Sequence, residues 1–344
     1  MRNIKVKLIA FLTIVACAKD FGLTETEAIE QNLLDEAGKD LSGYKIAFSD
    51  LFNIYMMNPD GKGLEQLTNT GKLSSYVSWS PDGKYIYFAG VHDISSLAAW
   101  EAYRVNVKTK ELTQISSFDK DVRSLGVSPD GETLAISVMT GNSNIGNNNN
   151  ELTKFSSNLY TMPISEVESK LSSGNQIVME DLTPLLSSPN DEQFWYEELN
   201  WNHDSDNPLL AYTKTWRYDE DEVSYTHAYT IKADGSDNTL IAENADQPIW
   251  SIDSDKISFL DLSYYDVELK IIKVSNVIGI NEEVSGGSFS PLGGKYIVYE
   301  IGDENRKGGI AKTEQLNTGS QFPFIGIYEP RWSPVLIDTD KNKN

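Results

Sequence analysis

The chain has 344 residues, of which 40% are hydrophobic and 10% aromatic, and this composition excludes a disordered protein because it can bury a core. Its formal net charge of −22 at pH 7 argues against nucleic acid as a partner, since the phosphates would be repelled. A single cysteine leaves no intramolecular disulfide, so the hydrophobic core alone must hold the folded part.

The N-terminal segment has the features of a secretion signal. Basic residues within Met1–Lys7 precede an apolar run, Leu8–Ala16, that is too short for a membrane span. The only cysteine, Cys17, follows directly, and the arrangement resembles a bacterial lipoprotein signal. This resemblance predicts removal of residues 1–16 and lipid attachment at Cys17, while Ala18 favours the outer membrane. An ordinary secretory peptide with an incidental cysteine is the alternative.

The first element expected after the signal is a helix. Residues 24–41 place apolar and acidic side chains at helical spacing, and Thr24 and Glu27 form a capping-box pattern at the start. We predict one amphipathic helix within a tether that spans residues 17–43.

A pattern then recurs along the rest of the chain. An aromatic residue is followed by a tight polar turn and by alternating apolar residues, as in SWSPDGKYIYF at 78–88. The aromatic or equivalent position falls at Trp79, Val127, Trp201, Trp250, Phe289 and Trp332. These positions are 48, 74, 49, 39 and 43 residues apart, and four of the five spacings match a propeller blade of roughly 40–50 residues.

Each repeat can be divided into strands. The inner strand ends on the aromatic residue, and Ser-Pro-Asp-Gly makes the turn because Pro fixes φ and Gly accepts a positive φ. The second strand alternates apolar residues, as at Tyr85–Phe88. Asn53–Thr68 and Ala228–Ala242 each predict a third strand, an Asp-Gly turn and a fourth strand.

The two ends of the repeat region complement each other. The last repeat stops after its inner strand at Trp332, and the first element, Tyr44–Asp50, reads as a second strand without an inner one. Together they complete one blade and leave no free sheet edge. We therefore predict an all-β, six-bladed β-propeller over residues 44–336, closed by pairing the N-terminal strands with the C-terminal inner strand and followed by a polar tail at 337–344.

The turn W-S-P-D-G-K together with the "IYMMNPDG" segment resembles the TolB-type, WD40-like propeller repeat of bacterial envelope proteins. The resemblance covers about Tyr44 to Leu336. It implies the propeller fold, whereas the same repeat serves peptidase accessory domains, lyases and binding scaffolds. The chain departs from TolB in having only residues 18–43 before the repeats, so no TolB role is carried over.

The propeller assigns every loop to one of two faces. Loops joining strands one to two and three to four lie on one face, which we call the turn face, and the remaining loops lie on the other, the loop face. Most of the irregular sequence falls on the loop face, at residues 89–102, 140–158, 183–198, 215–224, 261–266 and 302–307. Insertions collected on one face of a repeat fold mark the side that is free to carry function.

The tryptophans divide in the same way. Four occupy the repeat position and are expected to be structural, whereas Trp100, Trp195 and Trp216 fall in predicted loops. Loop aromatics beside polar groups suit contacts to proteins or sugars, with packing of each loop onto the disc as the alternative. The predicted ligand-binding residues are Trp100, Trp195, Tyr196, Trp216, Arg217, Tyr218, Tyr264 and Tyr265.

The segment WRYDEDE at 216–222 is the most concentrated polar feature. Its four carboxylates raise the alternative of a calcium site, since that ion takes several oxygen ligands, but the EF-hand pattern is missing. We assign no metal and no cofactor.

The sequence offers little support for an enzyme. The nearest approach to G-x-S-x-G, at 141–146, has the wrong spacing. Of the three histidines, His92 and His203 are expected on opposite faces, which disfavours a histidine-rich metal centre. No catalytic residue is assigned, although two facing carboxylates could hydrolyse a glycoside.

These observations predict a lipid-anchored envelope propeller that binds an envelope protein or a glycan through its loop face, with no nucleic-acid partner. The main alternative is a polysaccharide-active enzyme, a lyase or a glycoside hydrolase, with carboxylates in the central funnel. A purely structural envelope scaffold is a third reading.

Overall fold

The computed structural model describes residues 25–70, 73–91, 100–140, 156–188, 193–217, 224–259, 264–268, 271–273, 284–301, 307–313 and 315–337. Cys17, Thr24 of the predicted capping box, Tyr218, His92 and the predicted loop 141–155 lie outside this part of the chain. Within it, the structure is an all-β propeller with few helices, as the sequence predicts.

The described strands form six four-stranded antiparallel sheets. From the innermost strand outward they are β24 (Tyr328–Trp332), β1 (Ile46–Ser49), β2 (Ile54–Met57) and β3 (Glu65–Gln66); β4 (Ser74–Trp79), β5 (Tyr85–Val91), β6 (Trp100–Asn106) and β7 (Leu112–Gln114); β8 (Val122–Val127), β9 (Thr133–Met139), β10 (Ser157–Pro163) and β11 (Thr183–Leu186); β12 (Gln193–Trp201), β13 (Leu209–Arg217), β14 (Ser224–Lys232) and β15 (Thr239–Glu243); β16 (Ile249–Trp250), β17 (Lys256–Ser258), β18 (Tyr264–Asp266) and β19 (Ile271–Lys273); and β20 (Val284–Phe289), β21 (Tyr296–Ile301), β22 (Lys307–Lys312) and β23 (Gln315–Ile325).

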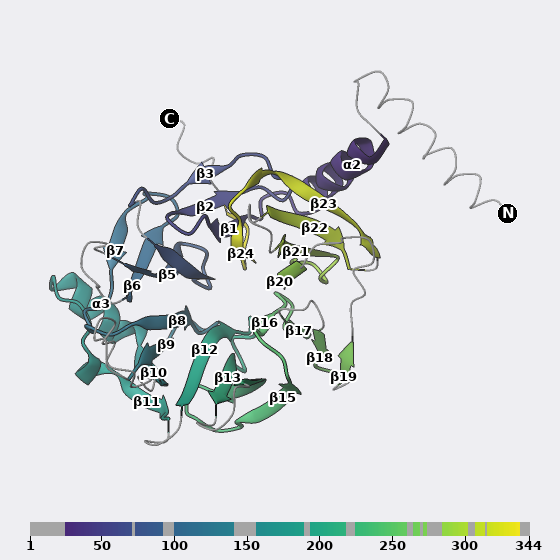
Figure 1. Ribbon diagram of the computed structural model, residues 1–344. Helices are drawn as coiled ribbons and strands as arrows, with labels where there is room; N and C mark the ends of the chain where they lie inside the picture. Colours follow the sequence, from purple (N-terminus) through teal and green to yellow (C-terminus); the bar gives the residue numbers. More distant parts are fainter. Residues whose placement is uncertain are drawn as a thin grey trace, which may run out of the picture.

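The sheets are arranged around a central channel (Figure 1). Their innermost strands contact one another in the order β24, β4, β8, β12, β16 and β20, and β20 contacts β24 again. The predicted closure is confirmed, because β24 pairs antiparallel with β1 and places Trp332 opposite Ile46. The last strand of the chain thereby completes the first sheet and ties the two ends of the propeller together.

The Ser-Pro-Asp-Gly turn forms as the sequence predicts. In the turn after β4, Gly83 has a φ of 68° and its N–H donates to the Ser80 carbonyl at 3.0 Å. The Asp82 carboxylate accepts from the Ser80 hydroxyl at 2.8 Å and from the Lys84 N–H at 3.0 Å. Short side chains thus satisfy the turn locally, which is why it is compact and can be repeated from sheet to sheet.

Two α-helices and one 3₁₀ turn, η1 (Met179–Asp181), accompany the strands in the described part. Helix α2 (Glu25–Asp40) matches the predicted N-terminal helix, and its Leu33, Leu34 and Ala37 pack into a core cluster with Tyr296 and Phe322. No helix in the described residues is long and apolar enough to cross a membrane.

Helix α3 (Ile164–Ser172) connects β10 to β11 and replaces the turn expected there. The buried Arg104 of β6 holds it through two hydrogen bonds to the Glu168 carboxylate, one of them 3.0 Å long. The Arg104 guanidinium also lies 4.4 Å from the centre of the Tyr85 ring, so the helix is fixed to the neighbouring sheet as well as to its own.

Candidate functional site

The segment predicted as the loop 183–198 is largely strand, which corrects the sequence analysis. Residues 183–186 form β11, and β12 begins at Gln193 and runs nine residues to Trp201. Strands β13 and β14 are also nine residues long, so this sheet extends farther toward the loop face than the repeat alone implies. Trp195, Tyr196, Trp216 and Arg217 are therefore strand residues.

Tyr196 is a core residue, contrary to the prediction of a ligand contact. Only 6% of it is exposed, and its ring packs edge-on against Tyr212 with the centroids 6.0 Å apart. Alternation along β12 places Trp195 on the opposite side of the sheet, where it pairs with Thr215. The two neighbouring aromatics consequently contact different parts of the propeller.

Trp216 lies at the centre of an aromatic ladder, the set of stacked rings Phe194, Trp216 and Tyr225 on β12, β13 and β14. The centroid of Trp216 is 6.4 Å from that of Phe194 and 5.7 Å from that of Tyr225, and both pairs are stacked within 20°. The ammonium group of Lys214 lies 4.7 Å from the Phe194 ring centre. Trp216 is half-buried and Tyr225 is 36% exposed, so the ladder offers aromatic surface at the loop face.

The remaining predicted residues are spread over other sheets. Trp100 begins β6, is half-buried, and packs against the core cluster shared by the β4–β7 and β8–β11 sheets. Tyr264 and Tyr265 lie in β18, and Arg217 ends β13. The structure thus brings Trp216 together with Phe194 and Tyr225, and it does not gather the predicted set into one patch.

The innermost strands supply functional candidates that the sequence analysis missed. Three residues before the repeat aromatic, Tyr76, Glu198, Gln247 and Glu329 each adopt a positive φ between 50° and 61°. The pairing register shifts beside Tyr76 and Glu198, as expected for β-bulges. Tyr76, Glu198 and Gln247 line a hollow of about 10 Å³ in the channel. Aligning the repeats on their aromatic residues would have singled out this position.

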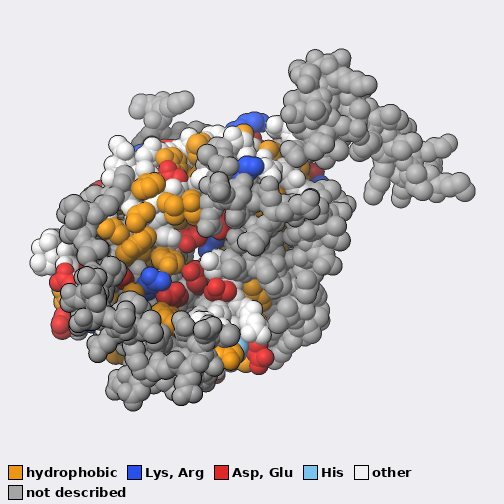
Figure 2. Space-filling view, in the orientation of Figure 1, with side chains coloured by type: hydrophobic (Ala, Val, Ile, Leu, Met, Phe, Trp, Pro, Cys, Tyr) orange, Lys and Arg blue, Asp and Glu red, His pale blue; other side chains and the backbone are white. Residues whose placement is uncertain are grey.

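Acidic side chains gather around the centre of the ring (Figure 2). The half-buried Glu198 has no hydrogen-bond donor among the described residues. Removal from water, and then the neighbouring carboxylates of Glu329, Asp246 and Glu197, raise the pKa of Glu198 well above its usual value, and Arg331 opposes them. The loop-face end of the channel therefore holds carboxylate groups that repel one another.

Glu329 has a different role from Glu198. Its carboxylate accepts hydrogen bonds from the Ser75 hydroxyl at 2.9 Å and from the backbone N–H groups of Tyr76 and Val77. These bonds join the C-terminal strand β24 to β4, the inner strand of the next sheet. Glu329 is thus fixed by the fold, whereas Glu198 remains available to a ligand.

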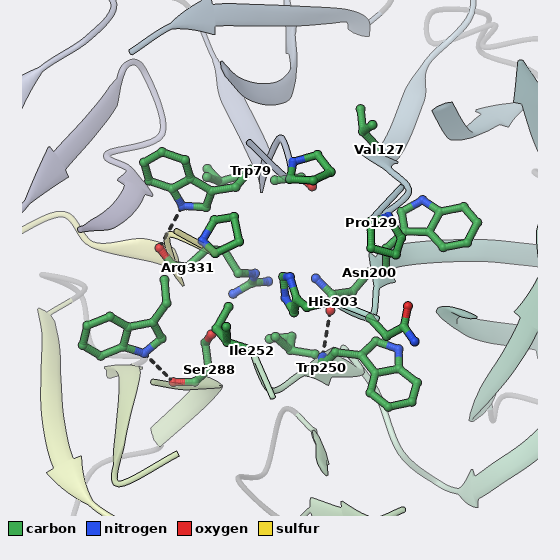
Figure 3. Close-up of a pocket in the computed structure, with 17 residues that line it drawn as sticks. Trp79, Val127, Pro129, Asn200, His203, Trp250, Ile252, Ser288 and Arg331 are labelled. Carbon is green, nitrogen blue, oxygen red and sulfur yellow. Dashed lines mark hydrogen bonds between the residues drawn. The ribbon is translucent and has the colours of Figure 1, made fainter. Parts of the chain in front are cut away.

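The turn-face end of the channel is a separate hollow of about 40 Å³. Figure 3 shows His203 and Arg331 pointing into it among the repeat tryptophans. Burial lowers the pKa of His203 to about 4, so its ring is neutral at pH 7. Because one water needs roughly 10–15 Å³, this hollow has room for a few waters and not for a sugar ring.

Three of the repeat tryptophans donate an indole N–H to a backbone carbonyl of the neighbouring inner strand. Trp79 donates to Arg331 at 3.1 Å, and Trp332 donates to Ser288 at 2.9 Å (Figure 3). Trp201 donates in the same way to Gly126 at 3.1 Å. The buried indole N–H of Trp250 has no acceptor among the described residues. All four rings are buried, which agrees with the structural role predicted for them.

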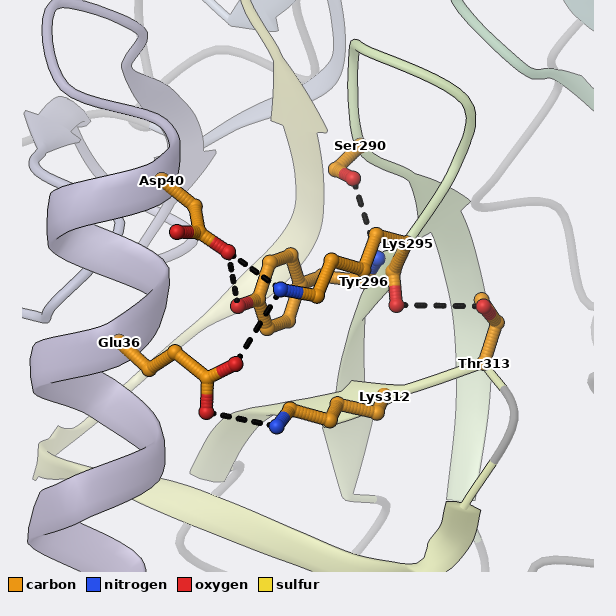
Figure 4. A network of polar contacts seen from close by, with 7 residues as sticks. All are labelled: Glu36, Asp40, Ser290, Lys295, Tyr296, Lys312 and Thr313. Carbon is orange, nitrogen blue, oxygen red and sulfur yellow. Dashed lines mark hydrogen bonds and ion pairs between the residues drawn. The ribbon is translucent and has the colours of Figure 1, made fainter.

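A polar network fixes helix α2, and with it the expected tether, to the rim of the propeller (Figure 4). The Glu36 carboxylate contacts Lys295 at 3.1 Å and Lys312 at 2.6 Å. Asp40 accepts from Lys295 and, at 2.9 Å, from the Tyr296 hydroxyl. The hydrogen bond from Lys295, followed by that from Tyr296, lowers the pKa of Asp40.

The described residues contain no group of three or more His, Cys, Asp or Glu side chains arranged to hold a metal ion. The last residues of the WRYDEDE segment lie outside the described part, so the structure does not bear on a calcium ion there.

No family model and no curated protein matches the sequence. Among solved structures, the chain is similar to TolB from Acinetobacter baumannii, with 16% identity, a TM-score of 0.54, and coverage of 84% of this chain and 66% of that one. The fold is that of a TolB-like β-propeller. A putative TolB from Agrobacterium tumefaciens gives 15% identity and a TM-score of 0.53, covering 83% of this chain and 90% of that one.

A third similar structure is hydrazine synthase from Kuenenia stuttgartiensis, with 13% identity and a TM-score of 0.61 over 86% of this chain and 47% of that one. The chain therefore spans just under two thirds of the Acinetobacter TolB chain and about half of the hydrazine synthase chain. At these identities the likeness concerns the fold alone.

Proposed function

We propose that this protein is a lipid-anchored, six-bladed β-propeller of a bacterial cell envelope that binds an envelope protein or glycan through its loop face. The N-terminal signal pattern ending at Cys17 supports the lipid anchor and the outer membrane as the location. The TolB-like fold supports the envelope assignment, since envelope proteins use this repeat.

The observation that carries the proposal is the aromatic ladder at the loop-face end of the β12–β15 sheet. Stacked rings that are partly exposed and accompanied by a cation give a rigid, amphipathic contact surface at little entropic cost. The turn face, by contrast, consists mainly of short turns that satisfy their own hydrogen bonds.

The proposal is tested by affinity capture from source envelopes, with the full chain in mild detergent as bait. A Trp216→Ala/Tyr225→Ala variant removes two rings of the ladder, and Leu292→Ala serves as control because Leu292 is 64% exposed in a turn-face loop. A protein or polysaccharide retained by the wild type and the control but lost by the double variant supports loop-face binding. Equal retention by all three baits contradicts it.

A polysaccharide-active enzyme remains the second candidate because carboxylates do gather in the channel, at Glu197, Glu198 and Glu329. Glycoside hydrolysis needs two carboxylates about 5–10 Å apart with a sugar between them. The hollow beside Glu198 measures about 10 Å³, which favours binding at the channel mouth over turnover inside it. A turnover screen on acidic and neutral polysaccharides separates the candidates, since an enzyme requires product formation that Glu198→Gln abolishes.

A further inference from the structure

An apolar pocket opens between the β24–β3 and β4–β7 sheets, away from the aromatic ladder. Its volume is about 90 Å³, several times the roughly 10–15 Å³ that one water needs. Its wall includes Leu73, Phe88, Tyr103 and Leu112, and Phe88 stacks on Tyr103 with the ring centres 5.7 Å apart. The pocket is large enough to receive one apolar side chain.

The absence of a side chain at Gly90 helps to form this pocket. A Cβ atom placed there would lie 3.2 Å from the Leu73 carbonyl oxygen and 3.4 Å from the Tyr103 ring. Leu112 lines the pocket and is 39% exposed, and Phe52, in the turn between β1 and β2, is 45% exposed. Figure 2 shows apolar side chains gathered over these two sheets, beside the acidic centre of the ring. Such a patch next to a pocket marks an interaction surface.

A shallow groove extends the pocket outward. This groove, of about 540 Å³, runs past residues 66–70 and shares Thr70 and Leu112 with the pocket. It can accommodate an extended chain that crosses from the rim of the propeller toward its centre.

The pocket and the acidic end of the channel are joined by β4. Ser74 lines the pocket, and the next residue, Ser75, donates to the Glu329 carboxylate. At about 3.3 Å per residue along a strand, the pocket and the carboxylates lie roughly 7–10 Å apart. A single extended segment can therefore reach both with side chains two or three residues apart.

The charges at the channel end decide what kind of segment fits. Five carboxylates interact there with two guanidinium groups, which leaves an excess of three negative charges when all are ionised: Glu197, Glu198, Asp246, Glu300 and Glu329 against Arg123 and Arg331. A cation placed beside Glu198 would relieve the repulsion among these groups and complement the overall charge of −22.

We propose that the loop face binds an extended protein segment that places an apolar side chain in the pocket beside Leu112 and a lysine or arginine, two or three residues away, beside Glu198. The inference rests on the proposed function in so far as both place the partner on the loop face. It concerns a different contact surface from the aromatic ladder and names the chemistry of the partner.

The test is selection from a display library of random twelve-residue peptides on the immobilised full chain. The expected result is enrichment of sequences with Lys or Arg two or three residues from Leu, Ile, Val or Phe. Binding of one enriched synthetic peptide is then measured by fluorescence polarisation at 50 and 300 mM salt, and it weakens at the higher salt because the contact is partly ionic. No enrichment, or enriched sequences without the cation, overturns the proposal.

Matched variants locate the site. Leu112→Ser and Glu198→Gln should each weaken peptide binding about tenfold, as expected for the loss of one anchoring contact of about 1.4 kcal/mol. Leu240→Ser and Glu132→Gln make the same chemical changes at exposed positions in other sheets and should change binding less than twofold. Equal effects of site and control variants would overturn the proposal.

A double-mutant cycle makes the result independent of any effect on folding. Replacing the peptide lysine by norleucine should cost about tenfold with the wild type and almost nothing with Glu198→Gln, because the partner charge is then already absent. Additive losses would show that the cation does not contact Glu198. If peptide binding fails while envelope capture still depends on Tyr225, only this inference is lost and the proposed function stands.

Discussion

The ring of indole hydrogen bonds between neighbouring sheets allows a matched test of what stabilises the propeller. Trp332 and Trp250 occupy the same repeat position and are 2% and 3% exposed. Trp332 donates to the buried Ser288 carbonyl at 2.9 Å, whereas the Trp250 indole N–H has no acceptor in the described residues. Replacing each by phenylalanine removes a similar part of a buried ring, so the two variants differ mainly in the hydrogen bond.

The expected difference follows from the cost of leaving buried polar groups unpaired, about 1–3 kcal/mol each. Trp332→Phe leaves the Ser288 carbonyl without its donor and incurs that cost. Trp250→Phe removes a donor that is already unpaired, so part of its cavity cost is offset by about the same amount. Trp332→Phe should therefore lower the free energy of unfolding by at least about 2 kcal/mol more than Trp250→Phe.

Urea unfolding followed by far-ultraviolet circular dichroism measures this difference without depending on tryptophan fluorescence. The comparison is valid where the two variants unfold with equal denaturant dependence. Equal losses of stability, or a larger loss for Trp250→Phe, would refute the view that the indole bonds fasten neighbouring sheets.

Three further predictions concern the helix and the channel. Leu41→Ala, which truncates a side chain that is 2% exposed between α2 and the propeller, should cost about 2–4 kcal/mol in urea unfolding, and an unchanged midpoint would contradict the packing. Because the pKa of Asp40 is lowered in the folded state, its bond to Lys295 stabilises the protein above the usual carboxyl pKa and is lost as the pH falls; Lys295→Met should therefore reduce stability at pH 7 and lose its effect near pH 3. Since the pKa of His203 is about 4 when folded and about 6.5 when unfolded, stability should decline by about 2–3 kcal/mol between pH 7 and pH 4, and His203→Gln should remove that part of the decline.

The sequence by itself determined the repeat and the way the ring closes. The Ser80–Gly83 turn satisfies its hydrogen bonds with its own side chains, so its sequence signature is local and survives repetition. The lone inner strand at Trp332 and the incomplete first sheet at Ile46 are complementary by counting alone, because an unpaired edge is unfavourable at either end. The same local logic identified helix α2 and the structural role of the repeat tryptophans.

The tertiary structure alone decided which side chains meet. Trp195 and Trp216 belong to one predicted patch in the sequence, but strand alternation and the register of β12 against β13 place them on opposite sides of a sheet. Glu198 and Glu329 are far apart in the chain and become neighbours only when the ring closes, at bulges that redirect both residues toward the channel. Contacts of this kind depend on the packing of separate sheets, and no local pattern of residues encodes them.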